Sequence, residues 1–175
     1  MIQYNNINFG FIILNPLRDI WAQRSTARTI LRTFNCDCLC VAPKDTNKEE
    51  LTQMNEFCPT IKAGNTYTDL INKGLEKTKS PWNVIVIAGT SIRAGTTKKY
   101  HYFIESEKDI LFPIVDKKYE FGEGSINGLV MHRNCIKEVG KFNNEDSLEL
   151  SKLVWADKAI SLGYKFKAIA GVKIL

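Results

Sequence analysis

The segment SPWNVIVIAGTSIR, residues 80–93, contains a run of β-branched residues with a turn signal on each side. The turn pair Ser80-Pro81 precedes it, and Gly89 follows it. A run of four to eight such residues between turn signals is typical of a strand that is buried on both faces. Strands of this kind belong to mostly parallel sheets that helices cover on both sides. We therefore predict that residues 84–88 form an interior strand of an α/β sheet.

The residues that follow this strand are candidates for a ligand site. In open α/β sheets, ligands bind beyond the carboxyl ends of the parallel strands. The stretch Gly89 to Arg93 has small, hydroxyl-bearing and basic residues at that position. A plain turn with no ligand is the alternative interpretation of the same five residues.

The N-terminal half alternates between strand and helix patterns. Apolar runs predict strands at 9–14, 37–42 and 60–63, and helical spacing of apolar residues predicts a helix at 25–34. Two capping-box pairs, Asn47 with Glu50 and Thr66 with Asp69, predict the starts of two more helices. This alternation indicates parallel strands joined by right-handed helical crossovers.

The C-terminal half has a mixed pattern. We predict strands at 99–104, 111–115 and 126–132, helices at 134–139 and 147–162, and a terminal strand at 164–175. Gly140 and Gly163 are placed to end the two helices. No linker or internal repeat divides the chain, so we expect one domain over residues 1–175.

The composition is that of an ordinary globular domain, with 44% hydrophobic and 25% charged residues. The net charge of +5 suits a phosphate-bearing ligand, but its lysines are scattered, and we do not expect nucleic acid to be the partner. The apolar run at 9–14 is too short to span a bilayer, so we expect no transmembrane segment. Five cysteines, an odd number, favour reduced thiols and a cytoplasmic location.

The order of four passages resembles the family-2 glycosyltransferases, which are inverting, nucleotide-sugar-dependent enzymes with the GT-A fold. The passages are GNTYTDLINKGLEKTKSPWNVIVIAGT (64–90), GSINGLVMHRNCIKEVGKF (124–142), LSKLVWADKAISLGYKFKAI (150–169), and the opening strands 9–16 with 37–45. The resemblance implies a GT-A-like fold with a central, mostly parallel sheet. It also implies a nucleotide-sugar donor and an acceptor hydroxyl on a glycan, a lipid or a protein.

The resemblance also implies which residues contact the donor. They lie where the first strands end and in the loop after residue 88: Asn15, Pro16, Asp45, Gly64, Asn65, Gly89, Thr90, Ser91 and Arg93. As isolated residues, Asn15, Asp45 and the Gly64-Asn65 pair are equally good turn formers.

The sequence departs from the family at the metal motif. The family has Asp-x-Asp at the end of the central strand, where carboxylates hold Mg²⁺ or Mn²⁺ against the diphosphate. Here residues 88–91 read Ala-Gly-Thr-Ser, without a carboxylate, so we predict no metal ligand there. Arg93, Lys98 and Lys99 are basic residues that could balance the diphosphate charge instead.

The catalytic base is displaced as well. The family carries an acid at the start of the late helix, a place equivalent here to about Ser151 and Lys152. The nearest acids, Glu145, Glu149 and Asp146, are the candidate catalytic residues. We predict Glu145 first and Glu149 second as the base, and we expect Asp146 to cap the helix. Because both signature acids are displaced, a non-catalytic binding or scaffolding module with the same fold is the alternative function.

Overall fold

The computed structural model describes residues 7–34, 36–114, 126–144 and 147–170. Their strands form one seven-stranded sheet with the order β3-β2-β1-β4-β6-β5-β7. The strands are β1 (Phe9–Leu14), β2 (Cys38–Pro43), β3 (Thr60–Ala63), β4 (Trp82–Ile87), β5 (Asp109–Pro113), β6 (Leu129–His132) and β7 (Lys165–Ile169).

The first four strands are mutually parallel, as the alternation of patterns predicts. β4 lies between β1 and β6, and Val84, Ile85 and Val86 are fully buried. The predicted interior strand is therefore confirmed. β6 runs antiparallel to both β4 and β5, while β7 pairs in parallel with β5, so the second half of the sheet is mixed.

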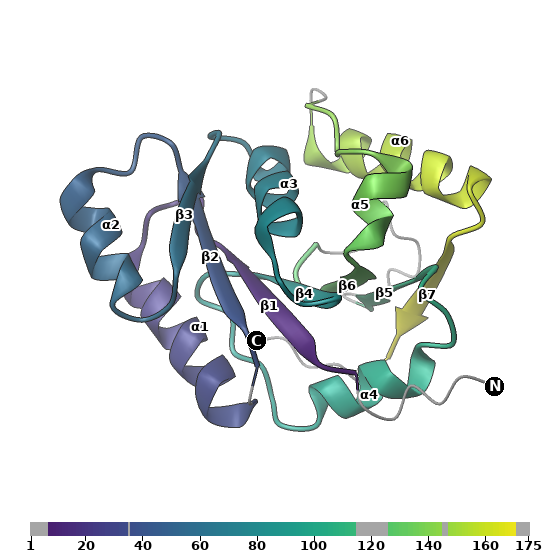
Figure 1. Cartoon of the computed structure of the whole chain (residues 1–175), viewed down its shortest axis with the longest axis horizontal. Helices are drawn as coiled ribbons and strands as arrows, with labels where there is room; N and C mark the ends of the chain where they lie inside the picture. The colour runs from purple at the N-terminus through teal and green to yellow at the C-terminus, as the bar shows by residue number, and fades with distance from the viewer. Residues whose placement is uncertain (1–6, 35, 115–125, 145–146, 171–175) are drawn as a thin grey trace.

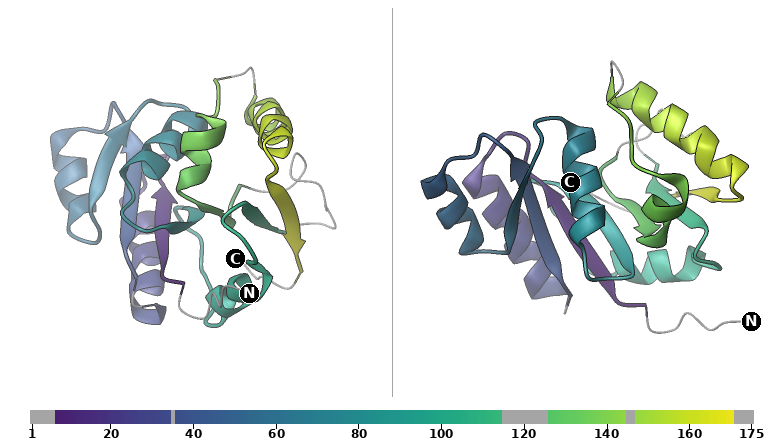
Figure 2. Two further views of the ribbon diagram at one scale, coloured as in Figure 1. Left: turned by 45° about the vertical axis from the view of Figure 1, so that its right-hand side comes forward. Right: turned by 45° about the horizontal axis from the view of Figure 1, so that its top comes forward.

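Helices cover both faces of the sheet (Figure 1). Their bounds are α1 (Ile20–Thr33), α2 (Lys48–Asn55), α3 (Tyr67–Lys77), α4 (Thr96–Phe103), α5 (Asn134–Val139) and α6 (Leu148–Ser161). α3, α5 and α6 lie on one side and α1 and α4 on the other, as the turned views in Figure 2 also show. Two separate groups of buried residues match these two layers.

Side-chain caps set several helix starts. Both predicted capping boxes are present, with Asn47 and Glu50 at α2 and with Thr66 and Asp69 at α3. α1 begins at Ile20, earlier than the predicted residue 25, because Asp19 caps it and accepts a hydrogen bond from the Ala22 amide. At the C-terminal end of α6, Gly163 has a φ of 84°, the left-handed conformation expected of a helix-ending glycine.

The strand predicted at 99–104 is wrong, because this segment forms α4. The alternation of Tyr100 with Tyr102 resembles a strand pattern, but Thr96, Tyr100 and Ile104 are the buried positions, four residues apart. Tyr100 is fully buried and donates a hydrogen bond to the Gly128 carbonyl at 3.2 Å. The burial of Tyr100 in this contact is what distinguishes the helical pattern from the strand pattern.

The predicted cap of the last helix is also wrong. Ser147 is the capping residue of α6, and its hydroxyl accepts a hydrogen bond from the Leu150 amide at 3.1 Å. A serine hydroxyl serves the orphan amides of a first turn as well as an aspartate does, so Asp146 is not needed for this contact. Asp146 itself lies outside the described residues.

Within the described residues, no helix is long and apolar enough to cross a membrane.

Candidate functional site

The carboxyl ends of β1, β2, β3 and β4 meet at one edge of the sheet, because these strands are parallel. All nine predicted donor-contacting residues follow these four ends. Asn127, which precedes the antiparallel β6, lies at the same edge, since its side chain reaches the end of β4. This edge is the candidate site.

Asn15 is 1% exposed and forms hydrogen bonds within the protein. Its Oδ1 accepts from the Asp19 amide at 3.0 Å, and its Nδ2 donates to the Asp19 carbonyl and to Gln23 Oε1 at 3.1 Å each. Asn15 therefore holds the turn from β1 to α1. The next residue, Pro16, is half-buried.

Asp45 stands at the exposed end of β2. Its Oδ2 lies 3.5 Å from Nη1 of Arg18, and both side chains are largely exposed to solvent. Arg18 has a φ of 57°, a left-handed conformation that is uncommon for a non-glycine residue. The pair places one positive and one negative charge at the site. Because both side chains are exposed, their ion pair adds little to the stability of the fold.

Gly64 allows the chain to pass close to Asp69. A Cβ at Gly64 would lie 2.2 Å from Oδ2 of Asp69, so no larger residue fits without a shift. Asp69 accepts hydrogen bonds from the hydroxyl of Thr66 at 2.7 Å and from its amide at 3.1 Å. The hydroxyl bond lowers the pKa of Asp69 and keeps its carboxylate ionised. Asn65 is exposed beside it.

The loop after β4 is held from the side of α1. Gly89, whose φ is 97°, donates its amide hydrogen to Thr26 Oγ1 at 2.9 Å. The Thr26 hydroxyl in turn donates to the Thr90 carbonyl at 2.9 Å. Thr26 is fully buried, and its place on the inner face of α1 is the only sequence signal that could have indicated this contact.

Asn127 holds the same loop from the other side. Its Oδ1 accepts from the Ile87 amide at 2.9 Å, and its Nδ2 donates to Thr90 Oγ1 at 2.9 Å. The Thr90 side chain is 6% exposed and engaged by the protein, while Ser91 and Arg93 are exposed. The loop therefore presents the Ser91 hydroxyl and the Arg93 guanidinium to solvent from a backbone that is tied on both sides.

Two of the three predicted catalytic acids, Glu145 and Asp146, lie outside the described residues. Asn144, the residue before them, accepts a hydrogen bond from the hydroxyl of Thr68 in α3, and its Oδ1 lies 3.0 Å from Oγ1 of the capping residue Thr66. Asn144 therefore lies near the N-terminus of α3, which follows the carboxyl end of β3. Glu149 is exposed in the first turn of α6.

A cation occupies the position where the resemblance implies an acid. Lys152 is 3% exposed in α6, and its neighbour Ser151 donates a hydrogen bond to the Asn143 carbonyl at 2.7 Å. Neither residue was among the predicted site residues, because a lysine in an amphipathic helix is usually exposed. The start of α6 is thus tied to the same loop as Asn144.

The donor atoms at the end of β4 do not suit a divalent cation. Residues 88–91 offer hydroxyl and backbone oxygens but no carboxylate, and Thr90 Oγ1 is bonded to Asn127. Within the described part of the chain, no group of three His, Cys, Asp or Glu side chains is arranged to hold a metal ion.

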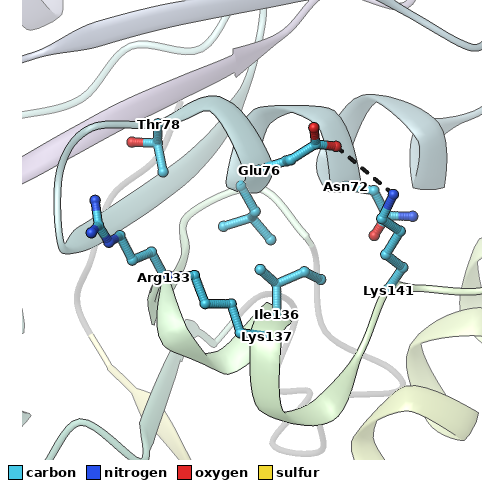
Figure 3. A pocket seen from close by; sticks show the side chains of 8 residues that line it. Asn72, Glu76, Thr78, Arg133, Ile136, Lys137 and Lys141 are labelled. Atoms are coloured by element: carbon cyan, nitrogen blue, oxygen red, sulfur yellow. Dashed lines mark ion pairs between the residues drawn. The ribbon is translucent and has the colours of Figure 1, made fainter.

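A pocket of about 340 Å³ lies away from this edge, between α3 and α5 (Figure 3). Arg133, the residue before α5, and Lys137 of α5 face Glu76 of α3 across it. Glu76 forms ion pairs with Lys141 at 3.8 Å and with Lys77 at 3.4 Å. The pocket contains none of the predicted site residues.

The cysteines behave as core residues. Cys40, Cys58 and Cys135 are buried, and all five are unbridged. Cys36, Cys38 and Cys40 belong to the packing of one face of β2, as the alternation of side chains predicts. Burial raises the pKa of Cys36 to about 11, which keeps this thiol protonated near neutral pH.

No family profile and no curated protein matches this sequence. Solved structures of S. aureus TarS match its fold. A crystal structure of S. aureus TarS gives a TM-score of 0.62 and 13% identity over 96% of this chain and 36% of the TarS chain. TarS 1–349 in complex with UDP gives a TM-score of 0.60 and 12% identity over 96% of this chain and 59% of that one.

A second structure of TarS 1–349 gives a TM-score of 0.62 and 12% identity over 96% of this chain and 59% of that one. This chain therefore spans between about a third and three fifths of the solved chains that it matches. At these identities the comparison concerns the fold alone. The predicted glycosyltransferase-like α/β fold, a mostly parallel sheet flanked by helices, is confirmed.

Proposed function

We propose that this chain binds a nucleotide-sugar at the carboxyl edge of its sheet and transfers the sugar to an acceptor hydroxyl, as a divergent family-2-type glycosyltransferase. In this proposal residues 1–175 act as one donor-binding unit. The acceptor belongs to the glycan, lipid or protein classes that the resemblance implies.

The observation that carries the proposal is the overlap with the UDP complex of TarS 1–349 over 96% of this chain. The local geometry supports it independently. The loop Gly89–Ser91 is held by Thr26 and Asn127 before any ligand arrives. A loop that is already ordered loses little conformational entropy on binding, which favours affinity.

The charge at the edge fits a diphosphate. Arg93 is exposed directly after the loop, and Lys98 is exposed in the first turn of α4. A guanidinium can form two parallel hydrogen bonds to phosphate oxygens, which makes Arg93 the strongest candidate for this contact. The charge that the family's metal supplies would come from these side chains.

In the transfer, the acceptor oxygen forms a bond to the anomeric carbon while the bond from that carbon to the diphosphate breaks. The nucleoside diphosphate leaves with the bond's electron pair, and a carboxylate takes the acceptor proton. We propose Glu145 first and Glu149 second as this base. The anchoring of Asn144 to α3 supports Glu145, since it places the preceding residue near the N-terminus of α3, which follows the carboxyl end of β3.

A non-catalytic binding module is the second candidate. The specific observation that favours it is the absence of a carboxylate at residues 88–91, together with a lysine at position 152. Such a module would retain donor binding and lack transfer.

A thermal-shift screen with UDP-, GDP-, CMP- and dTDP-sugars, each with Mn²⁺ and with EDTA, tests binding. A ligand that is selective for the native state stabilises it by about 2.7 kcal/mol at a hundred times its Kd. We expect one nucleotide class to raise the melting temperature and the shift to persist in EDTA. Loss of the shift on chelation would refute metal-independent binding, and no shift with any donor would refute the proposal.

Variants then separate the two candidates. Arg93→Gln should weaken donor binding, while Lys165→Gln, an exposed charge on β7, serves as the control. Glu145→Gln should lower turnover by roughly a hundredfold with donor binding unchanged. Glu49→Gln in α2 is the matched control. Donor binding by wild-type protein without transfer to any acceptor would favour the binding module.

A further inference from the structure

The outer face of α1 is basic and apolar at once. Arg24, Arg28 and Arg32 recur every four residues and lie on one side of the helix. Trp21 on the same side is 74% exposed, and Leu31 is 47% exposed. The opposite side of α1, which faces the sheet, carries the buried residues Gln23, Thr26, Ala27 and Ile30.

No acid balances this charge on the helix. α1 contains no Asp or Glu, and α4 on the same side of the sheet contains none either (Figure 1). Together the two helices carry five Arg and Lys residues, as much positive charge as the net +5 of the whole chain. In the described part of the chain, none of the three α1 arginines lies within ion-pairing distance of a carboxylate.

The arginines line a shallow hollow rather than a flat surface. Its volume is about 460 Å³, and its lining consists of Trp21, Arg24, Ser25, Arg28, Thr29 and Arg32. Arg24 is held in place, with its guanidinium carbon 5.4 Å from the centre of the Trp21 ring and 4.8 Å from that of Phe57. The hollow thus combines hydrogen-bond donors for phosphate with an indole at its rim.

Other exposed apolar side chains lie next to α1 in the chain and on α4, which is on the same side of the sheet. Leu17, just before the helix, is 84% exposed, and on α4 Tyr102 is 83% and Phe103 37% exposed. Exposed apolar groups among basic residues indicate an interaction surface rather than ordinary solvation. Leu17 follows the carboxyl end of β1, so the surface adjoins the candidate site.

We propose that the face formed by Leu17, Trp21, Arg24, Arg28, Leu31 and Arg32, the α1 face, docks on an anionic phospholipid bilayer. Arginines pair with lipid phosphates there, and the leucines and the indole enter the interface, where tryptophan is favoured. A second copy of this chain does not fit, since the two faces would repel each other. A nucleic acid would leave the exposed leucines without an apolar partner. The proposal does not depend on the glycosyltransferase activity.

Vesicle binding with two lipid compositions tests the proposal. The chain is mixed with vesicles of phosphatidylglycerol and phosphatidylcholine, or of phosphatidylcholine alone, and sedimented at low and high salt. We expect binding to the anionic vesicles only, and weaker binding at 0.5 M salt because screening shortens the reach of the charges. Equal binding to both compositions, or no binding to the anionic one at low salt, would overturn the proposal.

Trp21 gives a direct optical readout. Trp82 and Trp155 are 3% exposed each, so a change in tryptophan emission on vesicle binding reports on Trp21. We expect a blue shift and quenching by brominated lipids, both absent in Trp21→Ala. Binding without a blue shift would show that the indole stays in water and would refute this mode of docking.

Charge variants locate the contact. Each basic residue near an anionic surface is worth about a fivefold change in binding, so Arg28→Gln with Arg32→Gln should weaken it roughly 30-fold. Lys137→Gln with Lys141→Gln removes the same charge from the opposite side of the sheet and should change binding little. Equal losses in the two double variants would overturn the assignment to α1. Binding to duplex DNA or RNA with a Trp21 response, and none to vesicles, would identify a nucleic-acid surface instead.

Discussion

The two helix layers of this molecule differ in the exposure of their tryptophans. On the side of α3, α5 and α6, the Trp155 ring stacks on Phe142 at 4.3 Å, and its Nε1 donates to the Gly140 carbonyl at 2.8 Å. On the side of α1 and α4, Trp21 and Tyr102 face solvent. Trp155 is thus used in packing, whereas Trp21 and Tyr102 are exposed on a layer that carries positive charge. The second layer is therefore the one on which we place a partner.

Each layer is also anchored differently to its surroundings. Asn72 in α3 bonds both backbone groups of Phe142, at 2.8 and 2.9 Å, and so ties α3 to the chain between α5 and α6. Gln23 in α1 donates to the Met54 carbonyl at 3.2 Å and to Thr60 Oγ1 at 3.0 Å, and so ties α1 to α2 and β3. In each layer, an amide side chain thus bonds residues that are distant in the chain.

The largest contrast is expected between two tryptophans. Trp155→Ala removes a 3%-exposed ring from the core and should lower the free energy of unfolding by about 3–5 kcal/mol. Trp21→Ala, on the exposed α1 face, should change it by no more than about 0.5 kcal/mol. Urea unfolding followed by circular dichroism measures both. Equal losses would mean that Trp21 is part of the packing and that the two layers do not differ as described.

A smaller effect is expected from the anchoring amides. Asn72→Ala leaves two backbone groups of Phe142 without partners and should cost about 2–3 kcal/mol. Hydrogen exchange should rise in α3 and α5 and remain unchanged in α1. Gln23→Ala should lower the free energy of unfolding by a similar amount, and hydrogen exchange should then rise in α1 and remain unchanged in α3 and α5. Uniform acceleration in both layers would contradict the separate anchoring of each.

The smallest expected effect is the titration of His132, which packs edge-on against Trp82 at the amino end of β4. Burial holds the pKa of His132 below its usual value, although Glu107 at 3.7 Å opposes this. The unfolded chain therefore binds the proton at higher pH. Stability should be fully present above about pH 6.5 and should decrease as the pH falls toward the lower folded pKa.

Urea unfolding at pH 7.5, 6.5 and 5.5 measures this dependence. His132→Gln should lose less stability than wild type between pH 6.5 and 5.5, because it lacks the titrating ring. If the stability of the wild-type protein instead rises as the pH falls from 6.5 to 5.5, His132 is charged in the folded state and paired with Glu107.

Elements with strong local signals were predicted correctly. β4 follows from a β-branched run between turns, and α2 and α3 follow from capping boxes that need only residues three positions apart. α4 was predicted as a strand because its aromatic residues alternate, and only the burial of Tyr100 under Gly128 reveals the helical period. The prediction for α4 was wrong because the deciding contact joins residues that are 28 positions apart in the chain.

The candidate site shows the same division. The places where strands end could be predicted, so the positions of the Gly89–Ser91 loop and of Asp45 after β4 and β2 follow from the sequence, while their contact with a donor stays a prediction. Two hydrogen bonds at the site could not be predicted: the one from Asn15 to Gln23 and the one from Asn127 to Thr90, 37 residues away. These partners meet only after the chain has folded. The predicted acids Glu145 and Asp146 lie outside the described residues and stay predictions.

Local chemistry alone was enough to establish the α/β class and the interior position of β4, and it predicts the edge at which a ligand would bind. These features depend on the hydrophobic period and on turn residues, which act over a few positions. Only the tertiary structure decided which side chains at that edge form hydrogen bonds within the protein and which are exposed to solvent. It also buried Trp155 of α6 and left Trp21 exposed on the basic α1 face, because burial depends on neighbours that are distant in the chain.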